Sequence, residues 1–194
     1  MADFARQIDQ FLQRLFPICR SITGEGNRKT LDILNEIVPI IQHEVTTGTK
    51  VYDWVIPDEW EIRDAWIATP DGHRIVDFQD NNLHIMSYSE PFKASMDWAE
   101  LKPHLHFHLE LPTAIPYRTT YYKRDWGFCV TQSQYAKLER LKGPFEVMVD
   151  SELKPGSLTY GECLLPGHSS QEILISCYIY HPSMANDCLS GMLL

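Results

Sequence analysis

One short segment carries the residues best suited to metal chemistry. His181 ends an almost unbroken apolar run, and Asp187 follows six residues later, just before Cys188. A neutral imidazole and a carboxylate are both zinc ligands, and a carboxylate can bridge two metal ions about 3.5–4 Å apart. His181 and Asp187 are therefore candidate metal ligands. A structural hydrogen-bonded pair is the alternative that the spacing leaves open.

The element that must position these two residues is the apolar run itself. Residues 173–180 are almost all apolar, which predicts a strand buried on both faces, as in the centre of a parallel sheet. In open α/β sheets, ligands and catalytic groups collect beyond the carboxyl ends of such strands. We therefore expect this strand to deliver His181 and Asp187 to that edge, with an apolar helix starting behind them.

A second group of possible ligands is a run of alternating histidines. His104, His106 and His108 are two residues apart, so on a strand all three would point to one face. Two such histidines on adjacent rungs can bind a metal ion, which makes a separate single-zinc site one hypothesis. The alternative is a histidine stripe that faces solvent or an interface, with the intervening apolar residues packed on the other face.

Residues 116–128 concentrate aromatic and arginine side chains. Arg118, Tyr121 and Arg124 could line a substrate cleft, in which an arginine would pair with a substrate carboxylate. The alternative is a hairpin with an ion-paired rim that joins Arg124 to Asp125.

The five cysteines argue against a disulfide framework, because their number is odd and no two have CxxC spacing. Reduced thiols in the cytoplasm fit better. Cys177 is expected inside the buried strand, where a reactive thiolate is disfavoured, while Cys188 lies on the loop and could be exposed. A cysteine hydrolase is therefore the weakest of the enzyme hypotheses.

Composition excludes several other classes of protein. The chain has 194 residues, of which 44% are hydrophobic and 22% charged, as expected for a globular protein. Its net charge of −9 argues against nucleic-acid binding. No apolar run reaches the roughly 18 residues that span a bilayer, and the N-terminal segment does not resemble a signal peptide. We expect a cytoplasmic protein without a membrane partner.

The periodicity of apolar residues predicts an α/β fold with a β-rich middle. A helix over 4–16 ends before Pro17, and a second helix begins with Asn27 as its N-cap and ends near Pro39. A hairpin turns at residues 70–72. The remaining predicted elements are a helix at 132–141 and strands at 45–54, 62–69, 73–78, 83–88, 104–109, 126–131, 145–149, 158–165 and 173–180.

A β-rich block between α/β segments suggests a subdomain inserted into a sheet domain. We predict an N-terminal part at 1–54, an inserted β-rich subdomain at 55–140, and the start of the catalytic sheet at 141–194 with the His181/Asp187 loop. The β subdomain could gate a substrate, bind a partner or form a homo-oligomer.

Five segments together carry a family resemblance that covers essentially the whole chain. They are FPICRSITGEG from residue 16, AIPYRTTYY from 114, DWGFC from 125, DSELKPGSLTYGE from 150 and HPSMANDCLSG from 181. The chain resembles the bacterial aminopeptidase-like proteins often found with polysaccharide-biosynthesis genes. These are similar to zinc aminopeptidases and glutamate-carboxypeptidase-like exopeptidases. The resemblance implies a mixed-sheet zinc exopeptidase-like core, incomplete here, with an inserted β domain, usually followed by a winged-helix domain.

The resemblance also implies roles for two residues. His181 would be a ligand of one of two zinc ions, and Asp187 the carboxylate that bridges both. The general base, the remaining carboxylate ligands and the last histidine would all lie beyond Leu194. Cys188 stands where the family usually has a small polar residue, often Asn, which could alter the surroundings of Asp187.

Two function hypotheses follow. The first is a zinc-dependent aminopeptidase-like hydrolase of peptide or amide bonds, acting on a small peptide or an aminoacyl compound such as an aminoacylated sugar. Because the missing ligands are essential, we expect this chain alone, as a C-terminally truncated portion, to have negligible activity. The second hypothesis is a non-catalytic binding or assembly module with a vestigial metal site.

Overall fold

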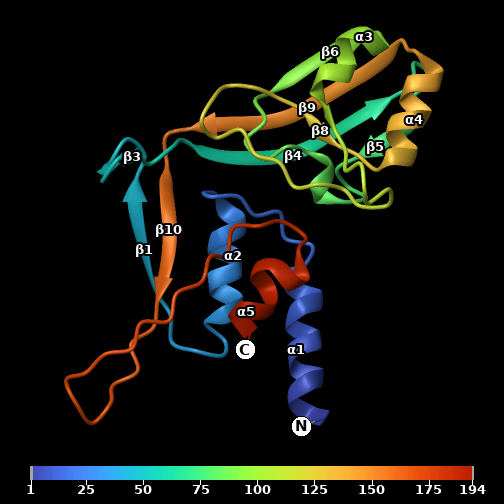
Figure 1. The fold of residues 1–194 in the computed structure, drawn as a ribbon. Helices are drawn as coiled ribbons and strands as arrows, with labels where there is room; N and C mark the ends of the chain where they lie inside the picture. Colours follow the sequence, from blue (N-terminus) through green and yellow to red (C-terminus); the bar gives the residue numbers. More distant parts are fainter. Residues whose placement is uncertain (1, 194) are drawn as a thin grey trace. The chain divides into compact units, whose positions relative to one another are not determined.

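The computed structural model describes residues 2–193, which form two compact units. Unit 1 combines the chain up to Glu59 with the chain from Pro155 onward, and unit 2 is the continuous stretch from Trp60 to Lys154. The elements of both units are labelled in Figure 1. That unit 2 is the inserted subdomain of an exopeptidase fold, with the limits 55–140, stays a prediction.

Two helices begin unit 1, α1 (Ala2–Leu15) and α2 (Glu25–Leu34). Two details of the prediction are wrong. Asn27 is not the N-cap of α2, because it lies inside the helix, where its Nδ2 donates to the carbonyl of Ser21 at 2.7 Å. The helix also ends at Leu34, well before Pro39, so the proline is not what stops it.

The strands of unit 1 form two small antiparallel pairs. β1 (Ile41–Thr46) pairs with β10 (Ser157–Glu162), so that Ile41 lies opposite Glu162 and Thr46 opposite Ser157. β2 (Lys50–Val51) and β3 (Trp54–Val55) form the second pair. The single strand predicted at 45–54 is thus divided, because the chain turns between Thr46 and Lys50 and again between β2 and β3.

The segment before His181 is not a strand, contrary to prediction. Residues 171–180 have no regular secondary structure, and the side chains of Ile173, Leu174 and Ile175 are 92%, 91% and 89% exposed. Cys177 is exposed as well. A strand needs hydrogen-bonding neighbours for its backbone, and within residues 2–193 no strand pairs with this segment.

Unit 1 ends in an irregular turn, η3 (Ala185–Leu189), and the short helix α5 (Ser190–Leu193). α5 lies beside α1 (Figure 1). Leu189 is completely buried and forms a small core with Leu15 and Leu34. This core therefore joins the end of η3 to both helices.

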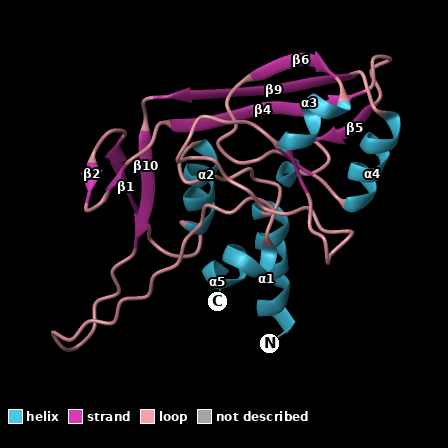
Figure 2. Ribbon diagram, turned by 45° about the horizontal axis from the view of Figure 1, so that its top comes forward, coloured by secondary structure: helices cyan, strands magenta, loops and turns pink. Residues whose placement is uncertain are grey.

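Unit 2 is built on a four-stranded sheet in the order β5-β4-β9-β6 (Figure 2). The strands are β4 (Glu59–Ala68), β5 (Arg74–Asp77), β6 (Phe92–Met96) and β9 (Phe145–Lys154). The predicted hairpin at 70–72 is present between β4 and β5, and Gly72 supplies its left-handed conformation with φ 87°. β9 buries alternate residues, as a strand with one inward face should.

Helix α4 (Gln132–Leu141) has the predicted limits, and a capping box of Thr131 and Gln134 starts it. The remaining elements of unit 2 are short: η1 (Asn82–His84), α3 (Trp98–Leu101), η2 (Lys102–His104), β7 (Leu105–His106) and β8 (Phe128–Cys129). The strand predicted at 83–88 is wrong, and of the strand predicted at 104–109 only Leu105–His106 is present, since each segment begins in a 3-10 turn. Asn81 caps the first of these turns, and Pro103 lies near the start of the second.

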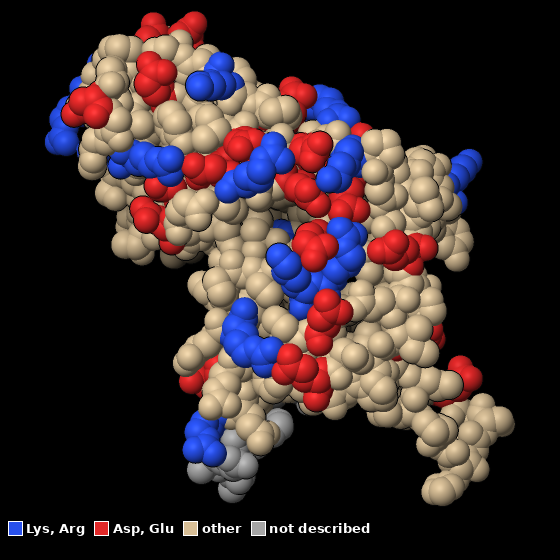
Figure 3. Space-filling view, turned by 180° about the vertical axis from the view of Figure 1, so that it is seen from behind, with Lys and Arg blue, Asp and Glu red and all other residues tan. Residues whose placement is uncertain are grey.

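The exposed face of β4 and β9 carries charges of both signs. Arg63 pairs with Asp150 at 2.5 Å, and Lys154 pairs with Glu61 at 3.2 Å. Figure 3 shows acidic and basic side chains interspersed on one face of the molecule.

Taken together, the helices and sheets of the described residues form a mixed α/β structure with several small sheets, which is the broad class that the sequence predicts. No helix within residues 2–193 has the length and apolarity needed to cross a bilayer.

Candidate metal site

The two predicted metal ligands lie in contact. Nδ1 of His181 is 3.0 Å from Oδ2 of Asp187. The His181 side chain is 12% exposed and that of Asp187 is 49% exposed. An imidazole nitrogen and a carboxylate oxygen therefore converge at the edge of unit 1, where the carboxylate is open to solvent.

The backbone of η3 turns the carboxylate toward the histidine. Asp187 has φ −91° and ψ 117°, and Cys188 has φ 87° and ψ −71°, so neither is helical. A positive φ is uncommon for a residue other than glycine and stores local strain. Strain of this kind is found at functional sites, and here it lies next to a candidate ligand.

Tyr178 forms hydrogen bonds with both Asp187 and Cys188. Its hydroxyl donates to Oδ1 of Asp187 at 2.7 Å, and its carbonyl accepts from Sγ of Cys188 at 2.7 Å. The hydrogen bond to Asp187 raises the pKa of the Tyr178 hydroxyl. Burial raises the pKa of the Cys188 thiol. Cys188 is therefore held as a neutral donor, which does not favour a nucleophilic thiolate.

The donor chemistry of this pair fits zinc, but the number of donors is too small. Catalytic zinc usually has three protein ligands and a water molecule. Among residues 2–193, no group of three or more His, Cys, Asp or Glu side chains is arranged to hold a metal ion. His181 and Asp187 can thus form part of a zinc site, and no step of a zinc-dependent reaction is assigned to them alone.

The alternating histidines do not form a joint site. Nδ1 of His104 contacts the Trp126 carbonyl at 2.9 Å, and its ring stacks on the Trp126 ring with centroids 3.8 Å apart. Burial lowers the pKa of His106. Nδ1 of His108 accepts from the amides of Glu110 and Leu111 at 3.1 Å. Only Leu105–His106 is a strand, so the expected common face does not exist.

The predicted substrate-binding residues belong to unit 2. Arg118 and Arg124 are exposed, and Tyr121 is half-buried against the rings of Tyr88 and Tyr122. Their participation in a substrate cleft stays a prediction.

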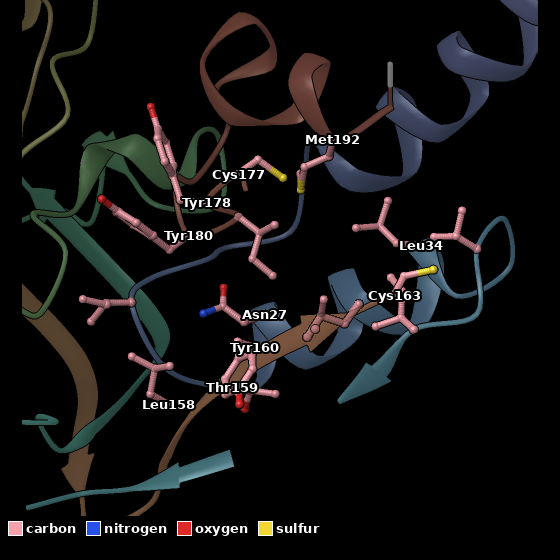
Figure 4. A pocket seen from close by; sticks show the side chains of 16 residues that line it. Asn27, Leu34, Leu158, Thr159, Tyr160, Cys163, Cys177, Tyr178, Tyr180 and Met192 are labelled. Carbon is pink, nitrogen blue, oxygen red and sulfur yellow. The ribbon is translucent and has the colours of Figure 1, made fainter. Parts of the chain in front are cut away.

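A cavity of about 450 Å³ lies within unit 1. It is lined by α2, by β10 and by residues 177–180 (Figure 4). Its lining is mostly apolar, and Asn27 lies between the two sides with 2% exposure. Neither His181 nor Asp187 lines this cavity, although Tyr178 belongs to both surroundings.

Sequence reasoning did not identify Arg20, a buried residue that contacts the candidate site. Its Nε donates to the carbonyl of His181 at 3.0 Å. The available signal was its place in the segment from residue 16, one of the five that carry the family resemblance. Nothing in local periodicity indicates that this arginine is buried.

Comparison with known proteins defines the class to which the chain belongs. The family model described as "Domain of unknown function (DUF4910)" matches residues 9–194, so the chain is a member of that family. A curated relative from Clostridium acetobutylicum is 49% identical over 188 residues and is named "Putative polysaccharide biosynthesis protein with aminopeptidase-like domain". The match covers 97% of this chain and 43% of the relative.

A solved structure from the same organism gives the same result. It is titled a crystal structure of a "putative peptidase" and matches with a TM-score of 0.92 and 49% identity, over 96% of this chain and 44% of that chain. The chain thus spans less than half the length of the relatives that it matches. The resemblance to aminopeptidase-like proteins of polysaccharide biosynthesis is confirmed.

Proposed function

We propose that this chain is part of a zinc-dependent aminopeptidase-like hydrolase, in which His181 and Asp187 are two of the metal ligands. The observation that supports the proposal is their contact at 3.0 Å, on a strained turn whose other bonds leave the carboxylate beside the imidazole. The family membership and the names of the relatives favour this function over an unrelated metal site.

In this proposal Tyr178 orients the carboxylate of Asp187 for metal binding. Tyr178 occupies one carboxylate oxygen of Asp187 and leaves the other facing His181. A bound zinc ion would acidify a coordinated water molecule to a pKa of about 7. The core would be that of a zinc exopeptidase, with unit 2 as its inserted subdomain. The protein would act in the cytoplasm on a small peptide or an aminoacyl compound.

The residues described here do not complete such a site. Two donors are fewer than the three protein ligands that catalytic zinc usually has. We therefore propose that the chain by itself binds zinc weakly and has negligible peptidase activity. The second candidate function is a binding or assembly module with a vestigial site. The exposed apolar side chains of residues 173–175 favour it, because they offer a surface that another polypeptide could cover.

The test is equilibrium dialysis of the purified chain against zinc, which measures the bound metal in the presence of the free metal and therefore detects weak binding. Three proteins are compared: the parent, Asp187→Ala and the control Asp53→Ala, which removes an exposed carboxylate of unit 1 outside the candidate site. The proposal expects zinc in the parent and the control and a loss in Asp187→Ala. Equal zinc in all three, or none in the parent, would favour the binding module.

A further inference from the structure

Arg20 is a buried arginine that joins two segments far apart in the sequence. Its side chain is 0% exposed. Nη1 donates to the carbonyl of Leu15 at 2.7 Å, and Nε donates to the carbonyl of His181, 161 residues away, at 3.0 Å. The guanidinium thus connects the end of α1 directly to the main chain of a candidate zinc ligand.

The pairing of this guanidinium is incomplete. Both of these acceptors are neutral carbonyl groups, and Nη2 has no hydrogen-bond partner within residues 2–193. Burial lowers the pKa of Arg20. A buried charge without an anionic partner is unfavourable for folding, and an apolar side chain of similar volume is often no worse. Stability therefore explains Arg20 poorly, whereas the position of its donors suggests another role.

The contacts of Arg20 belong to a larger attachment of the His181 loop. Oγ of Ser183 donates to the carbonyl of Phe16 at 3.2 Å, so two bonds fix the start of this loop to the segment after α1. Leu189 fixes its other end by packing against Leu15 and Leu34. Asp187 lies between these two attachments, at the strained turn.

The segment that carries Arg20 is itself held tightly against α2. A Cβ added to Gly26 would lie 2.0 Å from the carbonyl oxygen of Cys19. Only glycine permits this approach of two backbones. Arg20 therefore projects from a support that has little freedom to move.

We infer that Arg20 is a positioning residue of the candidate metal site: it holds the main chain at His181 so that the imidazole meets Asp187. The inference rests on the proposed zinc-binding function. Residues that orient metal ligands from behind typically change metal affinity by about 10–100-fold when they are removed.

The experiment compares Arg20→Met, Arg20→Lys and the control Arg14→Met. Arg14 forms an exposed ion pair with Glu36 at 2.6 Å and does not contact the loop. Each protein is titrated with zinc in competition with a chromophoric chelator, well below its unfolding temperature. Each is also titrated with Co²⁺, whose absorption spectrum reports ligand geometry. Amide hydrogen exchange of residues 181–189 is measured without metal.

We expect Arg20→Met to weaken zinc binding at least tenfold, to alter the cobalt spectrum and to speed amide exchange in 181–189. We expect Arg20→Lys to recover part of the affinity, since an ammonium group can still donate to one of the two carbonyls. Arg14→Met should behave like the parent. Unchanged affinity, spectrum and exchange in Arg20→Met would overturn the inference.

Two other outcomes are decisive. If both Arg20 variants lose their near-UV circular dichroism, Arg20 is needed for folding and the positioning role is wrong. If the parent binds no metal, the proposed function fails. Amide hydrogen exchange then tests by itself whether Arg20 holds the loop. Faster exchange confined to 181–189 then supports its role in holding the loop, and unchanged exchange overturns it.

Discussion

Two apolar segments of this chain have opposite environments. In unit 2, strand β9 buries Phe145, Val147 and Val149 to 0%, 1% and 2% exposure. In unit 1, Ile173, Leu174 and Ile175 are 92%, 91% and 89% exposed. Both segments are rich in residues that favour strands.

The difference lies in their neighbours. β9 lies between β4 and β6, so its backbone hydrogen bonds are made on both edges and its inward side chains meet other strands. Residues 173–180 have no paired strand within residues 2–193. An apolar run thus becomes a buried strand only where partners exist. The candidate metal ligands lie in unit 1, and the largest sheet lies in unit 2.

The largest loss of stability is expected from a substitution in β9. Phe145→Ala removes a fully buried aromatic ring and should lower the free energy of unfolding of unit 2 by about 3–5 kcal/mol. The measurement is chemical denaturation followed by tryptophan fluorescence. A loss below about 1 kcal/mol would show that β9 is not the well-packed strand described here.

The next effect concerns the support of the His181 loop in unit 1. Gly26→Ala places a Cβ 2.0 Å from the Cys19 carbonyl oxygen, so the backbone must move. Overpacking of this kind costs about 1–3 kcal/mol. The control is Gly167→Ala, where a Cβ meets nothing within 4 Å. Equal denaturation midpoints for the two variants would contradict the close approach of the segment after α1 to α2.

The stability of unit 2 should depend on pH through His84. Burial lowers the pKa of His84, whose Nδ1 lies 2.8 Å from the Cys129 carbonyl. The unfolded state therefore takes up a proton at higher pH, near about 6.5, than the folded state does. Unit 2 should lose stability as the pH falls below about 6.5, toward the lowered pKa of His84 in the folded state.

The measurement is chemical denaturation of the parent at several pH values, and His84→Gln provides the control. The glutamine variant should have a flatter dependence of stability on pH, although the lowered pKa of His106 contributes in the same direction. An equally steep dependence in the variant and the parent would show that His84 is not responsible.

The smallest effect on stability is expected at the exposed apolar run. Ile175→Asp changes a side chain that is 89% exposed, so the free energy of unfolding should change by no more than about 0.5 kcal/mol. Because the run forms an apolar surface, the same substitution should reduce self-association and the binding of a hydrophobic dye. A strongly destabilised variant would mean that Ile175 is buried in solution.

Particular residues show what the sequence could predict. The hairpin at 70–72 and helix α4 follow from local turn and capping chemistry, and both have the predicted positions. The His181–Asp187 contact was expected from residue types on one loop. The strand at 173–180 and the histidine stripe were not found. Hydrophobicity and alternation favour a strand, but a strand forms only where neighbouring strands bond to its backbone. Arg20 could not be foreseen, since arginine is rarely buried and its acceptors lie far away in sequence.

In the proposed function His181 and Asp187 bind zinc together, and Cys188 is not a ligand. X-ray absorption at the zinc edge of the zinc-loaded chain tests this most directly, because sulfur ligands lie at about 2.3 Å and nitrogen or oxygen ligands at about 2.0–2.2 Å. We predict nitrogen and oxygen ligands with one imidazole, which is lost in His181→Ala. A sulfur ligand at about 2.3 Å, or an unchanged imidazole signal in His181→Ala, would show that zinc is not bound by His181 and Asp187.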